Sequence, residues 1–223
     1  MSRRSALIHA TAVAIEPVQA AFAALWPEAE TVNILDDALS VDRAKDERLT
    51  PAMTERILAL AAYARGLGAE GILFTCSAFG PAIEAASLES PMPVLKPNEA
   101  MFEAAVRAGR NIAMVATFEA SVAGMTAEFE TEARRAGVEA GLTSVVAPAA
   151  MAALRTGDAE THNRLVAEAA VAMLPCDAIV LAQFSTSRAA DAVRARVGVP
   201  VLTSPDSAVA KLKRLLAGGK TGC

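Results

Sequence analysis

Short apolar runs alternate with longer stretches of helical periodicity along the whole chain. Eight runs have the length and apolar character of strands buried on both faces: residues 5–9, 31–35, 71–75, 93–95, 111–116, 142–146, 178–182 and 199–202. Helices are expected between them: residues 16–25, 51–65, a segment after Gly80-Pro81, 121–136, 158–174, and a closing helix from Ser204. This alternation is typical of a parallel sheet covered on both faces by helices.

Two of the expected helices carry strong start signals. The helix over residues 51–65 has Thr50 as an N-cap, proline at its first position, and Gly66 and Gly68 to end it. The closing helix has Ser204 in the N-cap position and Pro205 in the first helical position. Both signals predict helix starts to within a residue.

The strand pattern repeats itself at a constant offset of 107 residues. Residues 71–80 read GILFTCSAFG and residues 178–186 read AIVLAQFST, which places Cys76 opposite Gln183. The same offset lays ALIHA at 6–10 over AMVAT at 113–117, and PVLKP at 93–97 over PVLTS at 200–204. The sequence therefore predicts two similar α/β half-domains related by a pseudo-two-fold duplication, with a cleft between them. Their expected extents are residues 1–96 with 205–223, and residues 97–204.

Composition and charge exclude several classes of protein. The 223 residues are 53% hydrophobic and carry a net charge of −4, without the basic block that nucleic-acid binding requires. Two histidines, and three cysteines at 76, 176 and 223 without close spacing, argue against a metal site or a disulfide framework. No apolar run reaches the 18 or so residues of a membrane span. We expect a cytoplasmic protein.

Ligands of open α/β sheets bind beyond the carboxyl ends of the strands. This rule selects a group of residues without reference to any motif: His9 to Thr11, Asp36, Asp37, Cys76, Ser77, Ala78, Lys96, Thr117, Gln183, Phe184 and Ser185. Thr75, the last residue of its strand, is a further candidate for substrate binding. Cys176 lies at the opposite end of its strand, and we expect it to pack in the core.

Cys76 stands between a strand and a helix. The first turn of a helix carries unpaired N–H groups and a partial positive charge. A thiol in that place can have a lowered pKa and act as a thiolate base or nucleophile. The alternative is that Cys76 is a small buried hydrophobic residue.

The two strand ends, FTCSA around Cys76 and VLAQFS around Gln183, together with their spacing and the Pro-Val-Leu segments, carry a family resemblance. The whole chain resembles the aspartate/glutamate/hydantoin racemase superfamily, which includes arylmalonate decarboxylases and maleate cis-trans isomerases. The resemblance implies cofactor-independent chemistry in which two cysteines move a proton on opposite sides of the substrate. Cys76 matches the first cysteine, whereas Gln183 takes the place of the second and has no useful pKa.

The resemblance also implies roles for other strand-end residues. Thr117 and Ser77 match positions that bind carboxylate oxygens, and Gln183 is left to donate an amide hydrogen bond to a carboxylate or enolate oxygen. Lys96 is a candidate partner for a substrate carboxylate, with a solvated hinge lysine as the alternative. His9 is a candidate acid or base in place of the missing thiol from its position alone, because the resemblance places a small or acidic residue nearby and not a histidine. The charged run 36–48 is expected to be a solvated loop, placed where a lid would lie.

Three functions follow from these residues. The first is a racemase- or isomerase-like enzyme acting on a small carboxylate such as an amino acid. The second is a decarboxylase with Cys76 as its sole proton donor, and the third a carboxylate-binding protein without catalysis. The expected partners are a small-molecule carboxylate and further copies of the chain in a homo-oligomer, with neither nucleic acid nor membrane.

Overall fold

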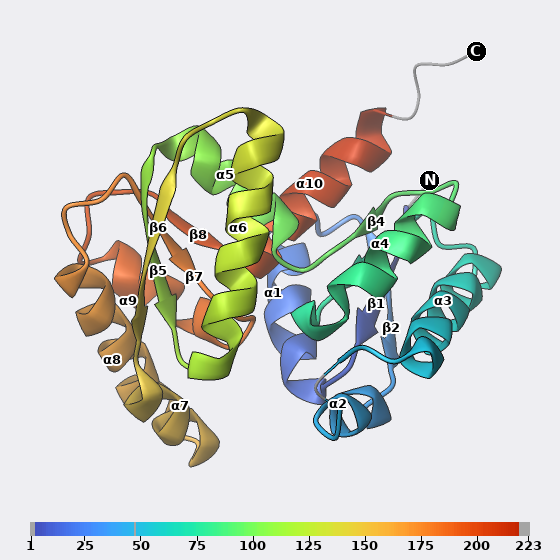
Figure 1. Ribbon diagram of the computed structural model, residues 1–223, viewed down its shortest axis with the longest axis horizontal. Coiled ribbons are helices and arrows are strands. Elements are labelled where there is room, and N and C mark those ends of the chain that lie inside the picture. The colour runs from blue at the N-terminus through green and yellow to red at the C-terminus, as the bar shows by residue number, and fades with distance from the viewer. Residues whose placement is uncertain (1–2, 47, 219–223) are drawn as a thin grey trace. The chain divides into compact units, whose positions relative to one another are not determined.

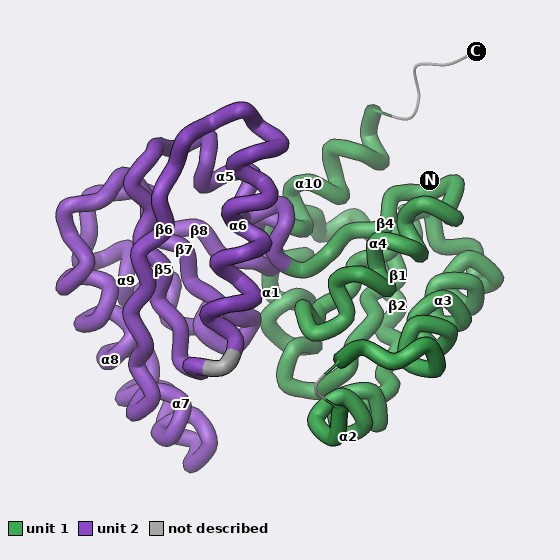
Figure 2. The backbone as a smooth tube through the Cα atoms, viewed as in Figure 1, with its two compact units in different colours: residues 1–97, 208–223 green, residues 98–207 purple. Residues whose placement is uncertain are grey.

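The computed structural model describes residues 3–46 and 48–218. The chain divides into two compact units (Figure 2): unit 1 comprises residues 1–97 and 208–223, and unit 2 comprises residues 98–207. The boundaries expected from the sequence, after residues 96 and 204, lie beside these. Unit 1 is therefore built from both ends of the chain and unit 2 from one continuous segment.

Unit 1 contains a four-stranded sheet in the order β2-β1-β3-β4, with every neighbouring pair parallel. Its strands are β1 (Arg4–His9), β2 (Glu30–Leu35), β3 (Gly71–Phe74) and β4 (Val94–Leu95). The helices are α1 (Ile15–Leu25), α2 (Ala38–Arg43), α3 (Pro51–Gly66) and α4 (Gly80–Glu89), with short 3-10 turns η1 (Ala12–Ala14) and η2 (Ser77–Phe79). The closing helix α10 (Ser204–Gly218) starts in unit 2 and continues into unit 1.

Unit 2 repeats the scheme with the strand order β6-β5-β7-β8, again all parallel (Figure 1). Its strands are β5 (Asn111–Ala116), β6 (Gly141–Val146), β7 (Ala178–Leu181) and β8 (Val201–Thr203). Its helices and turns are α5 (Glu99–Ala108), η3 (Glu119–Ser121), α6 (Val122–Ala136), α7 (Pro148–Arg155), α8 (Ala159–Ala172), η4 (Thr186–Ala189) and α9 (Ala190–Arg194). None of the helices in the described part of the chain is long and apolar enough to cross a membrane.

The two sheets have the same strand order, and individual hydrogen bonds within one sheet have equivalents within the other. The N–H of Thr75 donates to the carbonyl of Ile8 at 3.0 Å, and the N–H of Ala182 donates to that of Val115 at 2.9 Å. Both pairs of residues differ by the offset of 107 that the sequence repeat shows. The predicted fold class, two similar parallel α/β half-domains, is confirmed.

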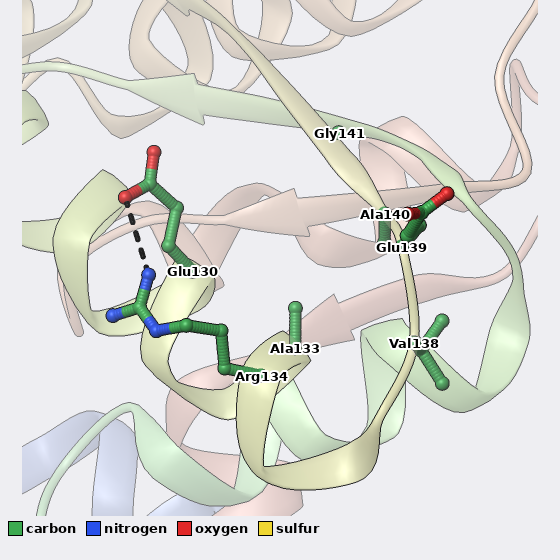
Figure 3. Close-up of a pocket in the computed structure, with 7 residues that line it drawn as sticks. All are labelled: Glu130, Ala133, Arg134, Val138, Glu139, Ala140 and Gly141. Atoms are coloured by element: carbon green, nitrogen blue, oxygen red, sulfur yellow. Dashed lines mark ion pairs between the residues drawn. The ribbon is translucent and has the colours of Figure 1, made fainter.

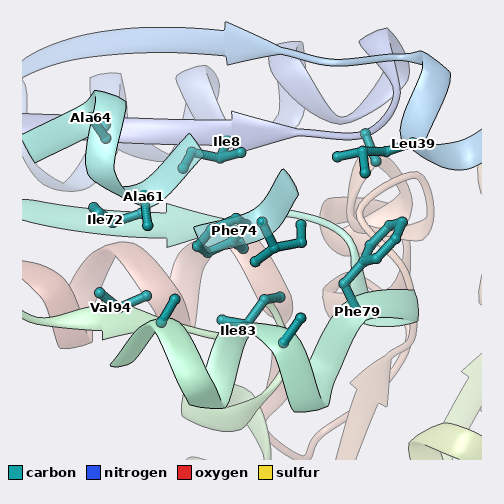
Figure 4. Close-up of a cluster of buried hydrophobic side chains, with 14 of the residues drawn as sticks. Ile8, Leu39, Ala61, Ala64, Ile72, Phe74, Phe79, Ile83 and Val94 are labelled. Atoms are coloured by element: carbon teal, nitrogen blue, oxygen red, sulfur yellow. The ribbon is translucent and has the colours of Figure 1, made fainter. Parts of the chain in front are cut away.

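Alternate residues of the central strands point to opposite faces of each sheet, and both faces are buried. In unit 1, Ala6 and Ile8 of β1 pack with Ile72 and Phe74 of β3 against α3 and α4 (Figure 4). On the other face, a Cβ on Gly71 would lie 2.8 Å from a methyl group of Leu212, so glycine lets α10 approach β3 closely.

Unit 2 shows the same alternation. Ile112, Met114 and Ala116 of β5 pack with residues of α5 and α6. The intervening Ala113 and Val115 pack with residues of α7, α8 and α9. The apolar runs of the inner strands are therefore buried on two sides, whereas the edge strands β2 and β6 are partly exposed, which corrects the expectation for residues 31–35 and 142–146.

Several expectations about helices need correction. The segments of α5 and α7 were not expected to be helical, and part of the run 36–48 forms α2 instead of a loop. Thr50 is an N-cap as predicted, since its hydroxyl accepts the N–H of Met53 at 3.3 Å. Ser204 is not the N-cap of α10. Thr203 accepts the N–H of Asp206 at 3.2 Å, while the Ser204 hydroxyl donates to the side-chain oxygen of Asn98.

Gly109 lies in the connection between α5 and β5, where there is no room for a side chain. An added Cβ would lie 2.2 Å from the Cβ of Asp177. The Asp177 carboxylate accepts the N–H groups of Arg110 and Asn111 at 2.7 and 2.8 Å, so it cannot move aside without losing them. We expect Gly109→Ala to lower the free energy of unfolding by about 1–3 kcal/mol in urea denaturation.

Gly124→Ala is the matched control, because an added Cβ at this helical position meets nothing within 4 Å. Alanine is a better helix former than glycine, so this variant should gain about 0.5–1 kcal/mol. Equal losses in both variants would contradict the proposed clash with Asp177.

Candidate active site

Cys76 lies two residues beyond the end of β3, where the chain turns into η2 and then α4. Its side chain is partly buried and packs against the apolar cluster of unit 1. The backbone N–H of Ala78 donates to the sulfur. The strand therefore delivers the thiol to the carboxyl edge of the sheet, as the sequence predicts.

The ionisation of Cys76 differs from the expectation of a lowered pKa. Burial raises the pKa of the Cys76 thiol above its ordinary value, because desolvation disfavours the thiolate. The hydrogen bond from Ala78 and the charge of Arg43 lower this pKa, but by less than burial raises it. The group is therefore a neutral thiol at neutral pH.

Arg43, at the end of α2, extends toward the turn that carries Cys76. Its Nε donates to the carbonyl oxygen of Ala78 at 3.3 Å, and its guanidinium also donates to the carbonyl of Asp46. Arg43 therefore holds the same peptide segment whose N–H contacts the sulfur, and brings a positive charge to it.

The charged run after β2 is anchored to unit 1. Leu39 is only 1% exposed and belongs to the apolar cluster. Arg56 of α3 forms ion pairs with Asp36 at 2.6 Å and Asp42 at 2.7 Å, one on either side of that leucine. These contacts explain why the segment is a helix, and they hold Arg43 in place.

His9 is fully buried at the end of β1. Asn33 accepts a hydrogen bond from its Nε2 at 3.0 Å, so in the neutral ring Nδ1 accepts from the Thr75 hydroxyl at 2.9 Å. Burial lowers the pKa of His9, which outweighs the opposite effect of the bond to Asn33. His9 is thus a neutral ring that fixes Thr75, the residue before Cys76.

The other candidates of unit 1 lie along the same edge. Ser77 is partly buried and Ala78 exposed, both within η2. Lys96 follows β4, and its ammonium forms an ion pair with Glu84 of α4 at 2.6 Å. A substrate carboxylate at Lys96 would have to compete with that glutamate.

In unit 2, the side chain of Gln183 is bonded to groups of its own half. Its Oε1 accepts both the backbone N–H and the hydroxyl of Thr117, each at 3.2 Å. Its Nε2 donates to the hydroxyl oxygen of Ser121 at 2.5 Å, and that hydroxyl donates to the carbonyl of Phe118 at 2.8 Å. The structure thus joins two predicted site residues, Thr117 and Gln183, directly.

The backbone of Gln183 has a φ of 71°, the one positive φ of a non-glycine residue among those described. This left-handed conformation is costly for a residue with a side chain. It is also the conformation in which the carboxamide reaches Thr117 at the end of the neighbouring strand β5.

Phe184 and Ser185 follow directly. Phe184 is 6% exposed and its carbonyl accepts from the Ser187 hydroxyl, while Ser185 is partly buried at the start of η4. Thr186 is fully buried, and its hydroxyl donates to the carbonyl of Gln183 at 2.8 Å. None of these hydroxyl groups is paired with a base in the described residues that would activate it.

Features elsewhere do not extend the site. A surface hollow of about 470 Å³ lies between the end of α6 and the start of β6, at the amino end of the sheet (Figure 3). The described residues include no group of three or more His, Cys, Asp or Glu side chains able to hold a metal ion. Cys176 packs at the edge of the apolar cluster of unit 2, and Cys223 lies outside the described residues.

Sequence reasoning missed three residues of these networks: Arg43, Asn33 and Ser121. Arg43 was hidden in a charged run, although Leu39 four residues earlier is an available signal for a buried helical face there. Asn33 interrupts an apolar strand, which is an available signal for a polar contact. Ser121 has no distinguishing pattern.

Comparisons with known proteins now identify the family. The Asp/Glu/hydantoin racemase family profile matches residues 8–175, about three quarters of the chain. The chain belongs to the Asp/Glu/hydantoin racemase family. No curated protein sequence matches it.

Solved structures of racemase-family folds resemble the chain over its whole length. Allantoin racemase from Klebsiella pneumoniae superposes with a TM-score of 0.70 at 18% identity, covering 98% of this chain and 89% of the other. Aspartate racemase from Picrophilus torridus gives 0.73 at 15% identity, covering 97% and 95%. A Gly74Cys mutant of arylmalonate decarboxylase gives 0.69 at 21% identity, covering 98% and 97%. At these identities the likeness establishes the shared fold.

The thiol of this family member should alkylate with an unusual pH dependence. Because burial raises the pKa of Cys76, the rate of iodoacetamide modification should still be rising with pH where an ordinary thiol, with a pKa of about 8.5, has reached its plateau. Mass spectrometry of the Cys76 peptide across pH measures this. A plateau reached near pH 7 would contradict the neutral thiol.

Arg43→Gln should shift the pH profile of Cys76 modification to still higher pH, because it removes the nearby positive charge that favours the thiolate. Modification of Cys76 at pH 8 should slow, and Arg43→Lys should restore part of the rate. Cys176 is the internal reference, because burial and Asp177 set the direction of its pKa shift and Arg43 does not affect it. Parallel shifts of both cysteines would indicate a general loss of structure instead.

Proposed function

We propose that this protein is a cofactor-independent enzyme that transfers a proton at the carbon next to a carboxylate of a small acid, with Cys76 as the transferring group. Membership of the Asp/Glu/hydantoin racemase family supports a racemase- or isomerase-like activity on a carboxylate substrate. The proposed substrate is an amino acid or a related small acid.

The observation that carries this proposal is the setting of the Cys76 thiol. It stands at the carboxyl edge of a parallel sheet, where ligands of such folds bind. The Ala78 N–H contacts its sulfur, and Arg43 bonds to the same peptide segment. These groups stabilise the thiolate when it forms, while burial keeps the resting group protonated. Such a thiol can both give and take a proton.

The chemistry is expected to be one-sided. Gln183, at the position that matches the second cysteine of the family's racemases, is a carboxamide that cannot accept a proton from carbon at neutral pH. The adjacent hydroxyl groups of Ser185 and Thr186 have no activating base among the described residues. Every proton transfer is therefore assigned to Cys76.

A second candidate function is decarboxylation, and the protonation of Cys76 favours it. In this reaction the bond to a carboxylate breaks, carbon dioxide leaves, and the electron pair stays on the remaining carbon as an enediolate. The Cys76 S–H then donates its proton to that carbon, and the thiolate regains a proton from water. A thiol whose raised pKa keeps it protonated at rest is ready for this step.

Turnover in deuterium oxide distinguishes the candidates. Single enantiomers of aspartate, glutamate and related acids, and an arylmalonate, are incubated with the enzyme. One-sided proton transfer by Cys76 incorporates deuterium at the carbon next to the carboxylate with retention of configuration, whereas loss of optical purity indicates a racemase with a second base on the opposite face. Decarboxylation releases carbon dioxide and leaves one deuterium in a product of one handedness. Binding without either change supports a carboxylate-binding protein instead.

Cys76→Ser should lower the rate of whichever reaction occurs by at least about 100-fold, because a positioned acid–base group contributes about 10²–10⁴-fold. Cys176→Ser is the matched control and should retain activity, since Cys176 lies at the amino end of its strand. Full activity in Cys76→Ser, with its fold intact by circular dichroism, would rule out the assigned role.

A further inference from the structure

The Gln183 carboxamide is held in the way that a carboxylate would be held. Two donors of one residue, the backbone N–H and the hydroxyl of Thr117, converge on its Oε1 at 3.2 Å each. A carboxamide and a carboxylate have nearly the same shape, and both present an oxygen to such a pair of donors. Thr117 is 2% exposed, so its donors are directed at this one acceptor.

The two Thr117 donors lie at the carboxyl edge of the sheet, where ligands of open α/β sheets bind. Thr117 directly follows β5, the central strand of the sheet in unit 2, at the carboxyl edge. The acceptor is supplied by Gln183, which follows β7, the strand hydrogen-bonded to β5. A side chain of the protein therefore fills the position at which a small ligand would meet the sheet edge.

The backbone of Gln183 adds an independent observation. Its φ of 71° is a conformation that glycine adopts without cost and that strains the backbone of other residues. Glycine at this position would leave the Thr117 donors without the carboxamide. The strain is offset by the three hydrogen bonds of the side chain.

We propose that the Gln183 carboxamide is an internal occupant of a carboxylate-binding cradle formed by Thr117, and that a ligand carboxylate displaces it. The inference rests on the proposed function in taking a small carboxylate as the ligand. Gln183 is then a specificity-determining residue: it competes with the ligand and does not contact it.

The exchange is favourable for an anion and unfavourable for a neutral group. A hydrogen bond to a carboxylate is about twice as strong as one to a neutral amide. The two bonds from Thr117 to the carboxamide are long, at 3.2 Å, so little is lost when they open. The bond from Gln183 to the Ser121 hydroxyl, at 2.5 Å, also opens when the amide leaves, and it is the larger loss that the ligand must offset. A neutral amide ligand gains nothing over the amide already present.

Binding of malonate tests the proposal, with its neutral diamide as the control ligand. Calorimetry on Gln183→Ala should give a malonate dissociation constant about 5–10-fold lower than wild type, because the carboxamide that competes for the Thr117 donors is gone. The diamide should show no such gain. Thr117→Val in the Gln183→Ala background should remove the gain, since it deletes one of the two donors.

The opposite sign would overturn the inference. If Gln183 donates directly to the ligand, Gln183→Ala binds malonate more weakly than wild type. Unchanged affinity also overturns it. The side-chain amide resonances of ¹⁵N-labelled Gln183 in wild-type protein give a second readout that needs no folded variant: malonate should shift them strongly as the bond to Ser121 breaks, and unperturbed resonances at saturation contradict displacement.

These measurements separate this inference from the proposed function. A gain of malonate binding in Gln183→Ala without turnover of any carboxylate supports the cradle and contradicts the enzyme. Turnover that depends on Cys76, with no gain of binding in Gln183→Ala, supports the enzyme and contradicts the cradle.

Discussion

Everything described for the two units depends on the parallel pairing of a central strand with the strand next in the sheet: β1 with β3, and β5 with β7. Parallel neighbours need a crossover connection, and the crossover helices cover both faces of the sheet. Both faces of β1 and β5 are therefore apolar, and chemistry is confined to the strand ends. The same pairing brings the residues after two strands together at one edge. His9 meets Thr75 there in unit 1, and Thr117 meets Gln183 in unit 2.

The carboxyl edges of the two sheets provide hydrogen-bond partners for buried polar groups in different ways. A polar group at the end of a buried strand must find a partner, because an unpaired buried donor or acceptor costs about 1–3 kcal/mol. Unit 1 uses a buried neutral histidine, which bonds to Thr75 and leaves the thiol of the next residue, Cys76, outside this contact. Unit 2 lacks a histidine at the matching place, Ala116, and Gln183 itself bonds to the strand end. The duplicated fold thus supports an ionisable group on one side and a neutral, self-bonded one on the other.

Much of the fold could be predicted because it follows from periodicity. The apolar runs, the offset of 107 residues and the Thr50 cap all depend on neighbours a few residues away. The α2 helix could not be predicted, because it is stabilised by Leu39 in a distant core and by Arg56 from another helix. The strand ends that carry the candidate site could be predicted too, because the apolar runs show where each strand ends. The raised pKa of Cys76 could not be predicted from the sequence, because it depends on how deeply the turn that carries the thiol is buried. The bond between Gln183 and Thr117 depends on a left-handed backbone that no local residue pattern signals.

The way α10 completes unit 1 has a consequence for synthesis of the chain. Leu212 and Leu216 pack close to Gly71 of β3, more than 140 residues earlier in the sequence. Unit 2 is continuous, so all of its sheet emerges from the ribosome before these two leucines do. During translation the first four strands wait for α10 to pack against Gly71 until the second half of the chain has been made. The inserted half is thus able to reach its native state first, and the half that carries Cys76 becomes complete only when the last helix is released.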